Sequence, residues 1–108
     1  MTEKNLILSF AILAAICFTA GGVLMKYADG TRNTGPTVGL VLLFVMGAIL
    51  HSHAMRWGAL GAVYALVLGL EAILAFGLGV LVFQESMSST KIAGLVLTIL
   101  GIALLRRG

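Results

Sequence analysis

The sequence predicts an all-α membrane protein with four transmembrane helices in one domain, residues 1–108. Hydrophobic residues make up 60% of the chain and charged residues only 10%, whereas about a quarter of the residues in a soluble domain are charged. The mean hydropathy is +1.12, and the charged residues fall between long apolar runs. The alternative is a highly apolar soluble helical bundle, but the chain has too few polar residues to cover the surface of such a bundle. The scattered basic residues also argue against nucleic acid as a partner, since that requires a clustered basic face.

The charged residues set the boundaries of four expected spans, at about residues 5–25, 37–55, 58–83 and 90–105. A helix needs roughly 20 residues to cross the hydrocarbon core of a bilayer. The first and third spans meet that length easily. The second and fourth are shorter, so we expect flanking basic side chains to reach outward to the headgroups. The first span also has features of a cleavable signal peptide, but three further spans follow it.

The distribution of basic residues barely favours one orientation. With four spans, one side of the membrane carries Lys4, Arg56, Arg106 and Arg107, and the other carries Lys26, Arg32 and Lys91. The positive-inside rule therefore permits insertion in both directions. This balance is compatible with an antiparallel dimer. The alternative is a fixed topology with both termini inside. In either case we expect a multi-pass protein of the cell inner (plasma) membrane.

A unit of only four helices can hardly enclose a substrate path alone, so we expect a dimer of four-helix units. Transporters commonly build their site between two repeats, and here a second chain would supply the second repeat. Gly94 and Gly101 lie on one stripe of the last span and are the expected dimer contacts, because small residues allow close helix approach. The partner is expected to be a second copy or a homologous subunit, with membrane lipid around it.

Glu71 is the only charged residue in the third apolar run. A charged side chain at the centre of a membrane helix costs about 2.5–3.5 kcal/mol on insertion scales, so its presence points to a substrate, an ion or a proton. Tyr64, Val67 or Leu68, and Glu71 share one helix face. We expect Tyr64, Val67 and Glu71 to line a binding site. The alternative is a protonated Glu71 that bonds a neighbouring carbonyl, or a position nearer the membrane surface.

Several segments together resemble the small multidrug resistance family. They are residues 24–30 (LMKYADG), 31–32 (TR), 36–39 (PTVG) and 63–65 (VYA), followed by Gly69 and the glycine spacing from 94 to 101. The resemblance covers nearly the whole chain and implies a four-helix membrane exporter whose fourth helix forms the dimer. Residues 69–75, 83–85 and 94 also look like a half-repeat of the larger drug/metabolite transporter superfamily.

The chain departs from that family at the positions that carry its chemistry. The membrane-embedded Glu of the family's first helix falls at Phe18, and no Asp or Glu occurs in residues 5–25. The family's third-helix Trp falls at Val67 and a family Gly falls at Glu71, whereas Tyr64 is kept. We expect Phe18 to line the cavity where the family acid would be, and Glu71 to be the one acid left at membrane depth.

These observations predict an exporter of organic cations, amines or amphiphilic compounds, coupled to protons through Glu71. The alternatives are a lipid or lipid-linked-sugar flippase subunit, with Lys26 or Arg32 near the headgroups, and one half of a heterodimeric exporter. No nucleophile–base pair is visible, so an enzyme is not expected. His51 and His53 are two residues apart without a third ligand nearby, so neither a metal nor a cofactor is predicted, and we interpret them as interfacial polar residues.

Overall fold

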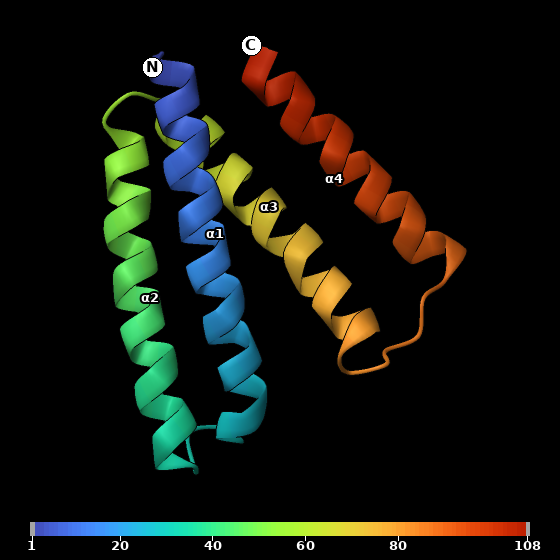
Figure 1. The fold of residues 1–108 in the computed structure, drawn as a ribbon. Helices are drawn as coiled ribbons and strands as arrows, with labels where there is room; N and C mark the ends of the chain where they lie inside the picture. Colours follow the sequence, from blue (N-terminus) through green and yellow to red (C-terminus); the bar gives the residue numbers. More distant parts are fainter. Residues whose placement is uncertain (1, 108) are drawn as a thin grey trace.

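The computed structural model describes residues 2–107, and four helices account for nearly all of them (Figure 1). They are α1 (Glu3–Ala28), α2 (Thr34–Met55), α3 (Leu60–Leu81) and α4 (Ser89–Arg107). Within the described range no strand is present, so the prediction of an all-α fold is confirmed. All four helices are long and apolar enough to cross a membrane. The shortest, α4, has 19 residues and spans about 28 Å at about 1.5 Å per residue.

Local sequence explains where α1 begins and ends. The Thr2 hydroxyl accepts a hydrogen bond from the Asn5 backbone N–H at 3.3 Å and caps the N-terminus. At the other end Asp29, Gly30 and Thr31 all adopt positive φ angles of 51°, 64° and 74°, which stops the helix. The Asn33 amide then donates to the Tyr27 carbonyl at 2.7 Å and fixes the turn.

The second helix begins before Pro36 rather than at it. Thr34 is its first residue, so the proline occupies the first turn. The backbone N–H groups of that turn have no partner inside the helix, and a proline that lacks the N–H is tolerated there. The helix therefore begins in the polar loop, a few residues ahead of the apolar run.

Glycines allow α1 and α2 to pack closely along their length (Figure 1). A Cβ atom added to Gly21 would lie 2.6 Å from the Phe44 ring, and one added to Gly47 would lie 2.8 Å from the Phe18 ring. Both distances are too short for a real Cβ atom, so each aromatic ring fills the space that its glycine leaves. The buried core continues from this interface into α3; its fully or almost fully buried members are Ala11, Ala14, Ala54, Val63, Leu66 and Val67.

In contrast, α4 packs only along part of α3 and otherwise stands apart (Figure 1). The contact passes through Gly69, where an added Cβ would lie 2.7 Å from Ile102. None of the residues of α4 is buried. Its apolar side chains are therefore available to lipid or to another protein chain. Both termini lie at one end of the bundle, and the α1–α2 and α3–α4 loops lie at the other (Figure 1).

Candidate functional site

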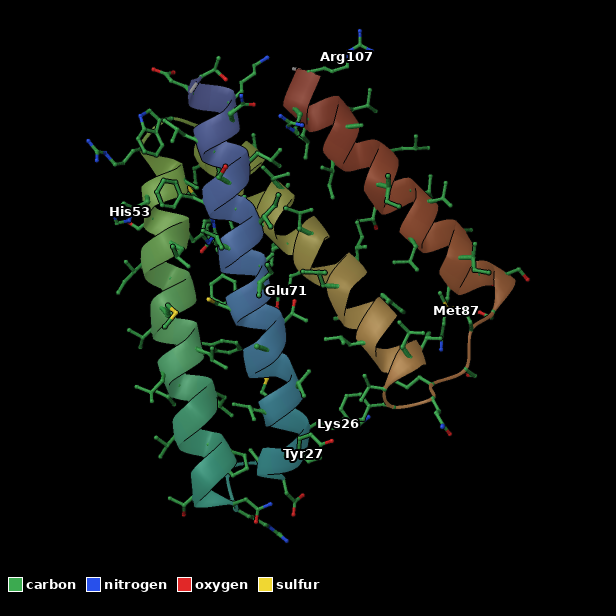
Figure 2. The ribbon with its side chains drawn as sticks, in the orientation of Figure 1. Lys26, Tyr27, His53, Glu71, Met87 and Arg107 are labelled. Atoms are coloured by element: carbon green, nitrogen blue, oxygen red, sulfur yellow. The ribbon has the colours of Figure 1, made fainter. Side chains whose placement is uncertain are left out.

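Glu71 lies in the middle of α3, and its side chain is located between α3 and α1 (Figure 2). Its side chain lines a pocket of about 250 Å³, which we call the Glu71 pocket. The walls come from α1, α3 and the segment that follows α3. The lining residues are Phe18, Thr19, Gly22, Val23, Lys26, Glu71, Ala75, Leu78, Gly79, Phe83 and Glu85. The pocket therefore extends from the centre of the apolar region toward the end of the bundle that carries the α1–α2 and α3–α4 loops.

Charged groups occupy two distinct positions along this pocket. Lys26, at the end of α1, pairs with Glu85 through Nζ and Oε2 at 3.1 Å, and its Nζ lies 4.8 Å from the centre of the Phe83 ring. This is the one ion pair between side chains in residues 2–107, and it does not include Glu71. About half of each of its two side chains is exposed, at 54% and 49%. The pocket thus combines a neutralised pair at its outer end with an uncompensated carboxyl farther in.

A buried hydroxyl adds a second polar group to the Glu71 pocket. Thr19 is only 6% exposed, and its Oγ1 has no hydrogen-bond partner among the described residues. Threonine in a helix commonly bonds the carbonyl one turn back, so an unpaired buried hydroxyl is unusual and costs free energy. A carboxylate, a free hydroxyl and the Phe18 ring are together suited to an organic ammonium group, because aromatic faces attract cations.

The structure does not bring all the expected site residues into one pocket. Tyr64 lines a second pocket of about 360 Å³ with Phe18 and His51, which we call the His51 pocket. Val67 is 1% exposed and belongs to the core instead of either pocket. Phe18 lines both pockets, so the surroundings of Glu71 and those of Tyr64 share this residue.

The two histidines differ in their surroundings, although we interpreted both as interfacial. His51 is 9% exposed, and its ring centre lies 4.8 Å from that of Tyr64. His53 is exposed on the outer side of α2 (Figure 2), and its Nδ1 lies 2.8 Å from the Ile49 carbonyl oxygen. Sequence reasoning missed the burial of His51 and Thr19. A polar residue inside an apolar run was the only available signal.

The expected dimer residues Gly94 and Gly101 lie on α4, where Gly94 is exposed and Gly101 is half-buried. An added Cβ atom at either position would meet nothing within 4 Å. By contrast, Gly69 serves packing within the chain, through Ile102 and Thr98. Gly94 and Gly101 therefore have open space around them, as a contact with a second chain would require.

Comparison with protein families confirms the resemblance seen in the sequence. The family model described as Small Multidrug Resistance protein matches residues 5–98, which include α2, α3, most of α1 and about half of α4. Members of this family are membrane transporters and not enzymes, which agrees with four candidate membrane spans in this chain. The chain is therefore a multi-pass membrane protein that belongs to the small multidrug resistance family.

Proposed function

We propose that this protein exports small organic cations, amines or amphiphilic compounds and exchanges them for protons at Glu71. The observation that carries the proposal is the shared location of Phe18 and Glu71. By the sequence resemblance, Phe18 falls at the position of the family's first-helix acid, and both residues line the Glu71 pocket. An acid on α3 instead of α1 therefore serves the same space from the facing helix.

A single carboxyl is sufficient for the exchange that we propose. A protonated Glu71 is neutral and compatible with an apolar pocket, whereas an ionised Glu71 in a region of low dielectric needs a positive partner. An ammonium substrate provides that partner, and its departure leaves the carboxylate free to take up a proton. Substrate and proton then alternate on the same group. Lys26 does not substitute for the substrate because its ammonium is paired with Glu85.

We further propose that the working unit is a dimer in the inner membrane. No residue of α4 is buried within the chain, and Gly94 and Gly101 face open space. A second copy, or a homologous subunit, that packs on α4 would give two Glu71 pockets related by symmetry.

A lipid flippase is the second candidate, and one observation favours it. Lys26 lines the outer end of the Glu71 pocket and is 54% exposed, so a lipid phosphate could replace Glu85 as its partner. In that case the apolar wall of the pocket would hold the acyl chain, and the activity would depend on Lys26 more than on Glu71.

Transport by the purified protein in proteoliposomes distinguishes these functions. The assay follows uptake of radiolabelled benzyltrimethylammonium, a permanently charged cation that has no neutral form able to cross lipid, driven by an imposed pH gradient. Wild type, Glu71→Gln and Glu85→Gln are compared. We expect Glu71→Gln to abolish gradient-driven uptake and Glu85→Gln to retain it. Uptake with unchanged pH dependence in Glu71→Gln would refute the proposal. Movement of a fluorescent phospholipid across the bilayer that is lost in Lys26→Gln would support the flippase instead.

A further inference from the structure

The His51 pocket shares Phe18 with the Glu71 pocket but does not include Glu71, and it has no role in the proposed exchange. It is formed by α1, α2 and α3, with a volume of about 360 Å³. Its lining residues are Phe18, Ala48, His51, Ser52, Met55, Leu60 and Tyr64. For scale, an apolar cavity of about 150 Å³ in another protein accepts benzene. The pocket is therefore large enough for an aromatic ring with a substituent.

One residue that lines this pocket has a buried polar atom without a partner. The His51 side chain is more than nine-tenths buried, with 9% exposed, and its Nε2 makes no hydrogen bond within residues 2–107. A buried nitrogen without a partner destabilises the folded chain. Such an atom in a native site calls for an explanation, and a ligand that bonds to it is one.

The rest of the pocket indicates the chemical class of that ligand. His51 lies between two aromatic rings in edge-to-face geometry, at 4.8 Å from Tyr64 and 6.2 Å from Phe18. Edge-to-face and offset contacts favour a further ring in the same cluster. None of the described lining residues carries a carboxylate, an ammonium or a guanidinium group. A charged ligand would therefore find no counter-ion, whereas an uncharged ring with one hydroxyl or N–H group would satisfy Nε2.

The His51 pocket lies close to the expected headgroup level of the membrane, so such compounds could enter it from the bilayer. His51 lies four residues before the end of α2 at Met55, which is about 6 Å along the helix axis. Just beyond that end, Trp57 stacks on Phe10 at 5.9 Å, and Arg56 lies 5.3 Å from the Trp57 ring. Tryptophan and arginine in this arrangement mark the headgroup level of a membrane, where small amphipathic aromatic compounds also gather.

We propose that the His51 pocket is a second binding site, for uncharged aromatic compounds that carry a hydroxyl or N–H group. In this proposal the His51 ring turns toward the bound compound, so that Nε2, which is inaccessible in this structure, bonds to this group. Phenol is the simplest such compound. The site does not depend on the exchange at Glu71, so its test can fail or succeed separately.

Nuclear magnetic resonance of the histidine rings tests this proposal directly, because the chain has only two histidines. The ¹⁵N-histidine-labelled full-length protein is placed in lipid nanodiscs and titrated with phenol. We expect a saturable shift of the His51 ring signals, no comparable shift for the exposed His53, and the same result in Glu71→Gln. Toluene, which has no hydroxyl, should shift His51 much less. No shift at His51, or equal shifts at both histidines, would overturn the proposal.

A matched pair of variants locates the binding. Ala48 lines the pocket and its side chain is exposed rather than part of the core, so Ala48→Leu should fill the pocket without disturbing the helices. We expect the phenol affinity to fall by roughly tenfold or more. Ala93→Leu makes the same change on exposed α4 and should leave the affinity unchanged. An unchanged affinity in Ala48→Leu, with the helical circular dichroism retained, would contradict binding at this site.

Discussion

Lys26 and Glu71 line the same pocket, but the Lys26 ammonium pairs with Glu85 at 3.1 Å and not with Glu71. The pairing partner lies just beyond the end of α3, whereas Glu71 lies at the middle of that helix (Figure 2). The positive charge is thereby held at the outer end of the pocket, and the carboxyl in the apolar region is left for an external cation.

Removal of the Lys26 charge should tighten the binding of a monovalent organic cation. Lys26→Gln leaves Glu85 unpaired and makes the outer end of the Glu71 pocket more negative, so we expect the Kd of benzylammonium to fall severalfold at low salt. The effect should shrink at high salt because ions screen exposed charges. Calorimetric titration measures it. Lys91→Gln is the control, since Lys91 bonds the Ser86 carbonyl outside the pocket. Equal effects of both variants would contradict a role for Lys26 in this pocket.

The buried Thr19 hydroxyl should distinguish substrates by their N–H groups. Its Oγ1 has no partner in the described chain and can accept a hydrogen bond from a primary ammonium but not from a quaternary one. Thr19→Val keeps the shape and removes the acceptor. We expect benzylammonium to bind about tenfold more weakly, since hydrogen bonds to charged groups contribute about 1.5–3 kcal/mol, and benzyltrimethylammonium to bind as before. Equal weakening of both would show that Thr19 is structural.

Gly47 should be intolerant of even one added carbon. An added Cβ would lie 2.8 Å from the Phe18 ring, and overpacking of this kind typically costs about 1–3 kcal/mol. Gly47→Ala should therefore lower the free energy of unfolding in detergent. Gly77→Ala is the matched control, because nothing lies within 4 Å of its Cβ position and alanine favours a helix over glycine by about 0.8–1 kcal/mol. Comparable loss in both variants would contradict the packing described for Phe18.

The exposed face of α4 should carry the contact between two chains. Gly94 and Gly101 have open space at their Cβ positions, so Gly101→Leu is harmless within one chain but obstructs close approach of a second helix. We expect the dimer fraction to fall in light-scattering measurements on protein in detergent. Gly77→Leu, on open α3 surface, should leave it unchanged. A dimer that persists unaltered in Gly101→Leu and in Gly94→Leu would place the contact elsewhere.

The fold was largely predictable because the bilayer imposes strict rules on a chain. Every backbone group in hydrocarbon must be bonded internally, so long uncharged runs become helices, and the charged residues mark their ends. The start of α2 at Thr34 was harder to predict from the sequence, because polar residues ahead of the apolar run also adopt helical geometry. The left-handed conformations of Asp29 and Thr31 likewise depend on the turn that the Asn33–Tyr27 hydrogen bond closes, and not only on the conformational preferences of the two residues.

The site was predictable only in part, for reasons of geometry between helices. Helical periodicity places Tyr64 and Glu71 on one face of α3, but it does not predict which other helix packs against each of these residues. In the structure Tyr64 lines the His51 pocket, Glu71 lines the Glu71 pocket, and Phe18 lines both. The burial of Val67 also depends on how α3 crosses α1. These relations follow from packing between helices, which a single sequence does not specify.

The most direct test of the central claim counts the protons released when a cation binds. Concentrated protein in weakly buffered detergent solution, at a pH where Glu71 is protonated, is mixed with benzyltrimethylammonium, and the pH change is recorded. We predict release of protons by wild type and by Glu85→Gln, and none by Glu71→Gln. Full release by a folded Glu71→Gln variant would mean that another group exchanges the proton, and the proposed role of Glu71 would then be wrong.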